Sequence, residues 1–376
     1  MKVSKRGGID PFVVMDVMRS ANRREAEGHS IVHMEVGQPA DPAPVAVREA
    51  AKLALDAHNI GYTEAFGIDP LRERIARYYH ETHGVTVDPG RVVVTTGSSG
   101  GFIVAFAAAF DPGDRVAIAS PGYPAYRNIL HALNIEVVSI PVGPDSHWQL
   151  HADALEKVQG KLDGVIIANP ANPTGSMLNR QELQNVAKWC EDHDSRLISD
   201  EIYHGISFGD PAATALGMAD HAVVINSFSK YFGMTGWRIG WMVVPPDLAR
   251  SVECLQQNLF ISAPTLSQLA AIHAFDCTVE LDARVARYAR NREVLLNDLP
   301  FDRLAPSDGA FYLYADVSDW TDNSPDFCRR MLTEVGVAAT PGIDFDPVRG
   351  LHTIRFSFAG ATEQMVEAVI RLKGWR

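Results

Sequence analysis

A lysine that follows an apolar run is the residue of this sequence best placed for covalent chemistry. Residues 222–225 are apolar and predict a buried strand, and the polar run Asn226-Ser227-Phe228-Ser229-Lys230 follows them directly. Because α/β sheets bind ligands in the crevice beyond the carboxyl ends of their strands, this strand would deliver Lys230 to such a crevice. Arg238 lies eight residues further on, in the turn Thr235-Gly236-Trp237-Arg238.

These residue types suit a cofactor that carries both an aldehyde and a phosphate. A desolvated lysine loses its charge readily, and the neutral amine can form a Schiff base with an aldehyde. An arginine and nearby hydroxyls can bind a phosphate. Pyridoxal 5'-phosphate has both groups. A solvated loop lysine is the alternative that this segment leaves open.

A second segment has the pattern of a phosphate-binding turn. Residues 92–96 predict a buried strand, Gly97-Ser98-Ser99-Gly100-Gly101 a turn, and residues 102–110 an apolar helix. Free backbone N–H groups and the helix dipole can bind an anion at such a turn, although an ordinary strand-to-helix connection has the same pattern. Gly97-x-Ser99-x-Gly101 also matches the nucleophile elbow of α/β-hydrolases, with His352 as the candidate base. A serine hydrolase is therefore a distant alternative, which leaves the other polar motifs unexplained.

Two further predicted strands end in polar residues, and a late strand carries an arginine. Asn172 lies in the proline-rich run 169–175 after the strand 164–168, and Asp200 and Tyr203 follow the strand 196–199. Asp200 would face the same crevice as Lys230, unless it only caps a helix on which Tyr203 packs. Arg355 lies opposite Ile354, Phe356 and Phe358 in a predicted half-buried strand, where it could bind a carboxylate or simply be solvated.

The order of elements predicts an α/β fold with two domains. Predicted strands and helices alternate through residues 42–280, which indicates a large domain with a mostly parallel sheet and helices on both faces. One of these helices would begin at Asp69-Pro70, with the aspartate as its cap. After residue 280 a long charged helix, 281–296, precedes two strands and two more helices. Residues 1–41 and 281–376 would together form a smaller α+β domain.

Composition excludes several classes of function. The chain has 376 residues, 46% of them hydrophobic, and a formal net charge of -12, which disfavours nucleic acid and anionic membranes as partners. Its four cysteines lie far apart with no C-x-x-C pair, so neither a zinc site nor a disulfide framework is indicated. No apolar core follows the basic residues near the start, and the longest apolar run is too short to span a bilayer. We therefore expect a soluble cytoplasmic enzyme without a metal.

Taken in order, these motifs resemble the class I/II aminotransferase family of pyridoxal-phosphate enzymes, which share the aspartate aminotransferase fold. The resemblance extends over nearly the whole chain, from Val36-Gly37-Gln38-Pro39 to Arg355-Phe356-Ser357. The order and spacing of the motifs are specific. The motifs are Asn169-Pro170-x-Asn172-Pro173-x-Gly175, Asp200-Glu201-x-Tyr203, Ser227-x-Ser229-Lys230 and Gly236-x-Arg238.

The resemblance implies a role for each matching residue. Lys230 would form the Schiff base and move a proton at the substrate Cα, and Asp200 would pair with the pyridine nitrogen. Tyr123 would stack on the ring, whose phenolic oxygen would bond to Asn172 and Tyr203. The phosphate would be bound by Ser98, Ser99, Ser227 and Arg238, with Tyr62 reaching it from the neighbouring subunit of a homodimer. Arg355 would bind the substrate α-carboxylate, close to Gly37 and Asn172.

The implied activity is transfer of an amino group from an L-amino acid to a 2-oxo acid, by a ping-pong mechanism through the Lys230 Schiff base. A carbon–sulfur β-lyase on the same fold is the nearer alternative, because it uses nearly the same residues. The sequence offers no second arginine for an acidic side chain, so aspartate is not supported as a substrate.

Overall fold

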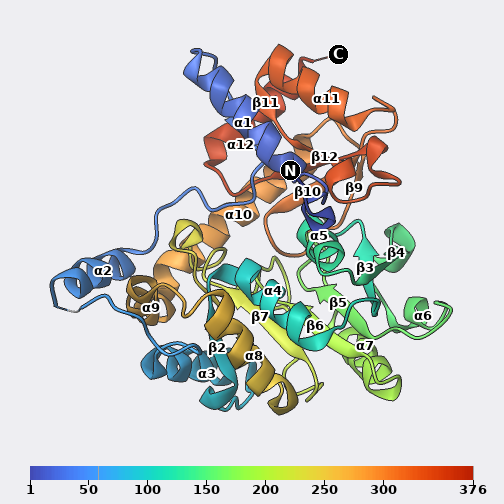
Figure 1. The fold of residues 1–376 in the computed structure, drawn as a ribbon. Helices are drawn as coiled ribbons and strands as arrows, with labels where there is room; N and C mark the ends of the chain where they lie inside the picture. The colour runs from blue at the N-terminus through green and yellow to red at the C-terminus, as the bar shows by residue number, and fades with distance from the viewer. Residues whose placement is uncertain (58, 376) are drawn as a thin grey trace.

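A seven-stranded sheet forms the centre of the larger part of the molecule (Figure 1). The computed structural model describes residues 1–57 and 59–375. The strand order is β2-β8-β7-β6-β5-β3-β4, and β8 alone among these strands is antiparallel to its neighbours, which confirms the prediction of a mostly parallel sheet. The strands are β2 Val92–Thr95, β3 Arg115–Ser120, β4 Glu136–Pro141, β5 Gly164–Ala168, β6 Arg196–Asp200, β7 Val223–Ser227 and β8 Gly240–Val243.

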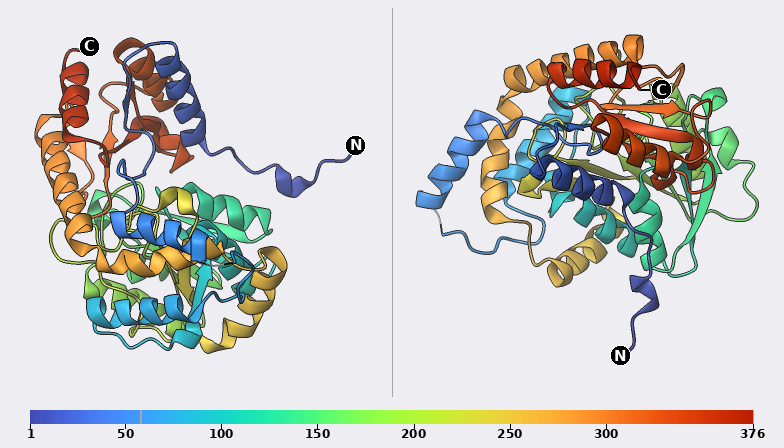
Figure 2. Two further views of the ribbon diagram at one scale, coloured as in Figure 1. Left: turned by 90° about the vertical axis from the view of Figure 1, so that its left-hand side faces the viewer. Right: turned by 90° about the horizontal axis from the view of Figure 1, so that it is seen from above.

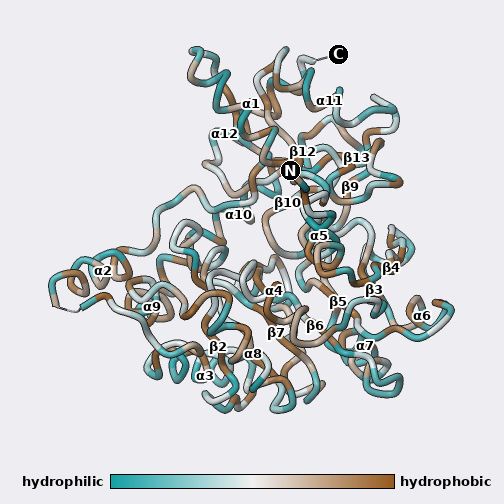
Figure 3. The backbone as a smooth tube through the Cα atoms, viewed as in Figure 1, coloured by the Kyte–Doolittle hydropathy of each residue, from teal (hydrophilic) through white to brown (hydrophobic). Residues whose placement is uncertain are grey.

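Helices cover both faces of this sheet because alternate strand residues point to opposite sides. On one face Ile166, Ile198 and Ile225 pack with the helices α4 Gly97–Ala109, α5 Pro124–Ala132 and α8 Pro246–Leu259. On the other face Val165, Leu197 and Val224 pack with α2 Val45–Ala57, α3 Asp69–His83, α7 Arg180–Asp192 and α9 Thr265–Ala271. Burial on both faces explains why these strands read as continuous apolar runs, which are brown in Figure 3.

A smaller sheet lies above the large one in Figure 1, with its own core. Its order is β12-β13-β10-β9, and β1 pairs with β11 in a separate parallel ribbon. The strands are β1 Val32–His33, β9 Arg303–Leu304, β10 Tyr312–Asp316, β11 Val337–Ala338, β12 Thr340–Pro341 and β13 Thr353–Ser357. The surrounding helices are α1 Val13–Ala26, α10 Thr278–Asp298, α11 Ser324–Arg330 and α12 Thr362–Lys373.

Short helical turns connect the main elements. Figure 2 shows the first residues, including one such turn, extending away from the body of the molecule. The turns are η1 Lys5–Gly7, η2 Pro89–Arg91, η3 Pro144–Ser146, α6 Ala152–Leu155, η4 Thr235–Trp237, η5 Ile272–Asp276, η6 Met331–Val335, η7 Gly342–Asp344 and η8 Gly350–His352. Over residues 1–57 and 59–375, no helix combines the length and the apolar character needed to cross a bilayer.

Three local predictions were wrong in detail. The glycine-rich stretch after β2 is not a separate turn, because α4 already begins at Gly97, whose φ of 66° turns the chain into the helix. Asp69 does not cap α3; Ile68 occupies the cap position and Asp69 lies in the first turn, where its charge favours the helix dipole. Strand β13 is not half-buried, since all its residues except Thr353 are buried.

Candidate active site

A cavity of about 560 Å³ lies at the carboxyl ends of the large sheet's strands, where the smaller sheet faces them. Nine of the residues predicted from the sequence line it, and they are Gly37, Ser98, Ser99, Tyr123, Asn172, Tyr203, Lys230, Arg238 and Arg355. Asp200 and Ser227 are buried at the ends of β6 and β7. Tyr62 is 83% exposed and does not line the cavity of its own chain.

Lys230 reaches the cavity from the loop that follows β7. Its Nζ donates a hydrogen bond of 2.7 Å to the carbonyl oxygen of Gly37. The pKa of Lys230 is lowered to about 8, chiefly by burial and also by the positive charges of Arg355 and Arg238, while Asp200 acts in the opposite direction. At pH 7 roughly a tenth of the lysine is therefore neutral. A neutral amine is the form that attacks an aldehyde.

Asp200 is the last residue of β6 and is 4% exposed. Its carboxylate accepts hydrogen bonds from the Ile202 backbone N–H, at 3.1 Å, and from the Tyr126 hydroxyl. Burial raises the pKa of Asp200 to about 6, although these two hydrogen bonds and the charge of Lys230 act in the opposite direction. A cation beside this carboxylate would favour its ionised form, which suits a protonated pyridine nitrogen.

Sequence reasoning missed Tyr126, which lies on α5 three residues after Tyr123. That spacing places the two tyrosines one helical turn apart, and their ring centres are 5.3 Å apart. The spacing was visible in the sequence and could have linked Tyr126 to the same cavity.

The first turn of α4 and Arg238 together form an anion-binding corner. A Cβ atom at Gly97 would overlap the Arg238 guanidinium, so the guanidinium lies directly against the first turn of the helix. Ser98 and Ser99 belong to that turn. Ser227 supports the adjacent loop, because its Oγ accepts a 3.0 Å hydrogen bond from the Ser229 N–H. A guanidinium, hydroxyls and a helix N-terminus in one place suit a phosphate.

Tyr203 and Gly37 both meet Tyr312, a second residue that sequence reasoning missed. The hydroxyls of Tyr203 and Tyr312 are 2.6 Å apart. A Cβ atom at Gly37 would overlap the Tyr312 hydroxyl, which explains why glycine is needed there. Tyr312 belongs to β10 and faces the cavity beside Arg355, whose guanidinium lies 4.3 Å from the tyrosine ring centre. The first of the two strands predicted after residue 280, residues 311–315, contains Tyr312, but the sequence does not indicate which face of the sheet Tyr312 occupies.

Arg355 is buried and held rigidly. One Nη atom donates to Asn172 Oδ1 at 2.8 Å, and the other donates to the Glu35 carbonyl oxygen at 2.6 Å. Its guanidinium lies between the rings of Tyr312 and Phe345, 4.3 and 4.6 Å from their centres. Its buried Nε has no hydrogen-bond partner among the described residues. A fixed guanidinium with an unused donor, on the wall of a cavity, suits a substrate carboxylate.

The residues present therefore fit pyridoxal phosphate, with an amine, a buried carboxylate and an anion-binding corner around one cavity. They do not fit a Ser99 hydrolase. His352 does not line the cavity with Ser99, and its Nδ1 lies 3.4 Å from the backbone oxygen of Thr321.

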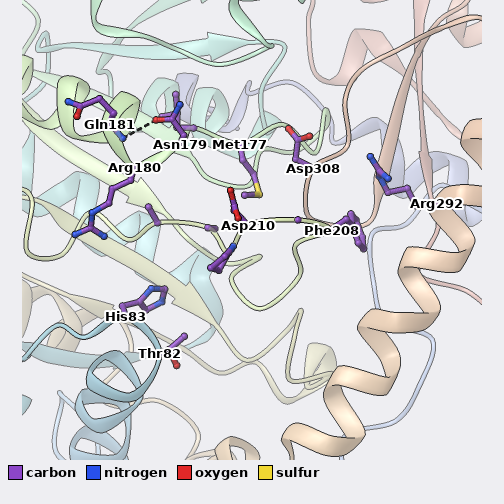
Figure 4. Close-up of a pocket in the computed structure, with 15 residues that line it drawn as sticks. Thr82, His83, Met177, Asn179, Arg180, Gln181, Phe208, Asp210, Arg292 and Asp308 are labelled. Carbon is purple, nitrogen blue, oxygen red and sulfur yellow. Dashed lines mark hydrogen bonds between the residues drawn. The ribbon is translucent and has the colours of Figure 1, made fainter.

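A separate cavity of about 710 Å³ shares no lining residue with this site (Figure 4). It lies between the end of α3, the start of α7 and Arg292 of α10. His83 lines it, 5.2 Å from the buried ring of His204. Burial lowers the pKa of His83 to about 4, so this histidine is neutral at pH 7. None of the residues predicted from the sequence belongs to this cavity.

Comparison with known proteins gives a consistent result. The family model described as aminotransferase class I and II matches residues 29–372. A valine–pyruvate aminotransferase of Mycobacterium tuberculosis is 51% identical over 381 aligned positions, which cover 100% of this chain and 98% of that protein.

Two solved structures agree in fold. One, of an aminotransferase from Mycobacterium tuberculosis, has a TM-score of 0.98 at 50% identity, covering 100% of this chain and 99% of its own. The other, of aspartate aminotransferase from Thermus thermophilus with maleate, has a TM-score of 0.92 at 27% identity, covering 99% and 98%. The chain therefore belongs to the class I and II aminotransferase family and is a pyridoxal-phosphate-dependent aminotransferase.

Proposed function

We propose that this enzyme moves the amino group of an L-amino acid with an apolar side chain to a 2-oxo acid, by a ping-pong mechanism. The observation that carries the proposal is the arrangement of Lys230, Asp200 and Arg355 around one cavity that also has an apolar wall. The similarity to a valine–pyruvate aminotransferase supports the same class of donor.

We assign the cofactor's contacts as follows. When bound, pyridoxal phosphate supplies an aldehyde for covalent attachment and a ring that withdraws electrons from the substrate Cα. Lys230 is the amine that anchors it, and Asp200 holds the proton on its ring nitrogen. Asn172 and Tyr203 orient the ring through its phenolic oxygen, while Tyr123 stacks on its face. The phosphate is bound by the first turn of α4 and by the side chains of Ser98, Ser99, Ser227 and Arg238.

Lys230 also acts on the substrate. Its Nζ would move a proton from the substrate Cα to the C4' carbon of the cofactor with the donor, and in the reverse direction with the acceptor, for which a pKa of about 8 is well suited. Arg355 binds the α-carboxylate, and the hydrogen bond to Asn172 fixes its orientation. The backbone of Gly37 lies beside Lys230, so no side chain competes with the substrate there.

The rest of the cavity favours an apolar side chain. Four of its lining residues, Phe12, Val14, Met15 and Met18, come from α1 and the residue before it. The arginines among the described lining residues are Arg238 and Arg355, which we assign to the phosphate and the α-carboxylate. An acidic side chain would therefore be desolvated without a cation to pair with.

The visible absorption spectrum of the purified holoenzyme tests the proposal. Borohydride is expected to abolish the visible absorption band of the bound cofactor. Addition of L-valine without an acceptor should shift this band, and later addition of pyruvate should restore it. A band that never changes with valine, combined with release of pyruvate and ammonia from a cysteine conjugate, would establish a β-lyase instead. A protein that shows no band after addition of pyridoxal phosphate would contradict the cofactor assignments.

Arg355→Lys is expected to reduce kcat/KM for L-valine by about 100-fold. The reason is that a planar guanidinium, which can donate two parallel hydrogen bonds to a carboxylate, is replaced by a single ammonium group. Isobutylamine, which is valine without its carboxylate, provides the internal control. The kcat/KM for isobutylamine, which is already low in the wild-type enzyme, should change little. The ratio of kcat/KM for valine to that for isobutylamine should therefore fall. If both donors lose activity equally, Arg355 does not bind the carboxylate.

We also propose a homodimer in which Tyr62 completes the partner's phosphate site. Tyr62 lies on a loop bound to the segment after α8, since Thr63 N–H donates to Ser262 Oγ at 3.4 Å and Thr265 Oγ1 donates to the Gly61 carbonyl oxygen at 2.5 Å. The apolar residues exposed on these two segments are Ile60, Tyr62, Leu259 and Ile261. Neighbouring exposed apolar side chains of this kind are typical of a protein interface.

Mixed dimers test the contribution of Tyr62. Tyr62→Ala is expected to weaken pyridoxal-phosphate affinity by about tenfold, the loss of one hydrogen bond. A dimer of one Tyr62→Ala chain and one Lys230→Ala chain should regain a single site with normal affinity, because the intact Lys230 meets the intact Tyr62 across the interface. A weakened site in that mixed dimer would place Tyr62 in its own chain's site.

The domain division and the compartment stay predictions. We propose that residues 42–280 form the cofactor domain and that residues 1–41 and 281–376 form the smaller domain, which is supported by buried cores drawn mostly from one or the other of these parts. A cytoplasmic location fits the four cysteines, all of which are free.

A further inference from the structure

Helix α1 supplies the apolar wall of the cavity but has no capping side chain of its own. Its cap residue is Phe12, whose side chain makes no capping hydrogen bond. The first N–H groups of any helix need partners outside the helix. The same turn carries Val14 and Met15, which line the cavity, so the position of this turn determines the shape of the wall.

Asp344 provides the missing cap from the far end of the chain. Its two carboxylate oxygens accept hydrogen bonds from the Val13 and Val14 N–H groups, at 3.1 and 3.2 Å. Asp344 is 2% exposed, so water does not compete strongly for these bonds. Its negative charge also lies at the positive end of the α1 dipole.

The remaining contacts of α1 leave its first turn dependent on this carboxylate. Ala21, in the second half of the helix, packs in a small apolar core with Ile31, Leu332 and Ala338. The chain before the helix is exposed as far as residue 11. Helix α1 also packs on β12, the Asn128 side chain donates to the Asp10 carbonyl oxygen before the helix, and Phe12 contacts Tyr123 edge-on. Among the described residues, however, Asp344 is the only side chain that binds N–H groups of the first turn.

The segment that carries Asp344 also supports the carboxylate site. The next residue, Phe345, places its ring 4.6 Å from the Arg355 guanidinium. Arg127 binds the backbone oxygen of Asp344 from the opposite side, at 3.4 Å. One short segment, residues 342–345, thus contacts both the arginine assigned to the α-carboxylate and the wall that would meet the side chain.

We propose that Asp344 is a positioning residue that fixes α1 against the cavity and thereby sets the preference for apolar donor side chains. The inference rests on the proposed function. Asp344 touches neither substrate nor cofactor in this assignment, so its removal should alter the choice of donor more than the chemistry itself. The side chain of alanine ends at Cβ and would contact the apolar wall little, whereas the two methyl groups of valine would extend toward it.

The test compares L-valine and L-alanine as donors to the same acceptor in Asp344→Asn holoenzyme. The variant is expected to lose about five- to tenfold in kcat/KM for valine, because the amide keeps one acceptor oxygen but loses the other acceptor and the negative charge, with less than a twofold change for alanine. Hydrogen exchange of the α1 first-turn amides should become faster in the cofactor-free variant, and pyridoxal-phosphate affinity should not change.

Asp346→Asn is the matched control. Asp346 is also 2% exposed, but it binds Val348 and Arg349 rather than α1. The valine-to-alanine ratio should therefore stay at the wild-type value. Met18→Ala is an independent test of the apolar wall. Shortening this side chain should lower the valine-to-alanine ratio of kcat/KM and leave the hydrogen bonds of Asp344 to α1 in place.

Two results would overturn the inference while leaving the proposed function intact. One is an equal loss for both donors in Asp344→Asn, and the other is a wild-type valine-to-alanine ratio in that variant, whatever the ratio in Met18→Ala. Failure of the wild-type enzyme to transaminate any amino acid would instead contradict the proposed function.

Discussion

Lys230→Ala is expected to lower kcat for transamination by at least about 10⁴-fold, because one change removes both the anchoring amine and the group that moves the Cα proton. Lys230 is the lysine among the described residues that line the cavity, so no neighbouring amine can replace it there. Steady-state and single-turnover assays with L-valine would measure the loss. Retention of the normal rate would refute the assignment of the site.

Two further measurements separate loss of chemistry from loss of the cofactor. The variant should still bind pyridoxal phosphate through Arg238 and the first turn of α4, but borohydride should no longer link the cofactor to the protein. A small added amine is expected to restore part of the proton transfer. Lys188→Ala is the matched control, because Lys188 is exposed and pairs only with Asp192 on the surface of α7.

The strands could be predicted because the large sheet is buried on both faces. Strands such as β5, β6 and β7 are continuous apolar runs, and each is followed at its carboxyl end by polar residues. In a parallel sheet these ends lie along one edge, so the polar residues that follow them are brought together. The pattern therefore predicts that Asn172, Asp200 and Lys230 lie near one another.

Residues held by contacts distant in sequence were not predictable in the same way. Tyr126 and Tyr312 are buried aromatic residues, and in a sequence they look the same as ordinary core residues. Only their contacts with Asp200 and Tyr203 distinguish them. Strand β8, which is antiparallel to both its neighbours, was not predicted from the sequence.

The place of α1 at the cavity was also not predictable, because it depends on a contact distant in sequence. The mixed residues 11–18, the charged residues that follow them and Gly28 predict only a helix in this part of the chain. Its place beside the cavity depends on Asp344, which is separated from Val14 by 330 residues in the sequence. No local pattern contains that hydrogen bond.

Asp200→Ala is expected to weaken pyridoxal-phosphate binding and to slow Cα proton transfer by about 10³-fold, within the range of a lost charge–charge contact at a buried site. The carboxylate must be ionised to hold a proton on the ring nitrogen. Its pKa of about 6 implies that in the wild-type enzyme cofactor affinity falls as the pH drops below 6 and is steady above it. In the variant this pH dependence should disappear. Cofactor titrations between pH 5 and 8 would measure both effects.

Glu201→Gln provides a sharp control because Glu201 is the next residue and is also fully buried. Burial raises the pKa of Glu201 to about 8, so at pH 7 the residue is mostly in the neutral form that glutamine imitates. Its carboxyl group accepts hydrogen bonds from Ser199, Thr214 and the Ala215 N–H rather than facing the cavity. Glu201→Gln should therefore preserve cofactor affinity and the single-turnover rate. If Asp200→Ala also left the single-turnover rate unchanged, Asp200 would have no role in the proton transfer.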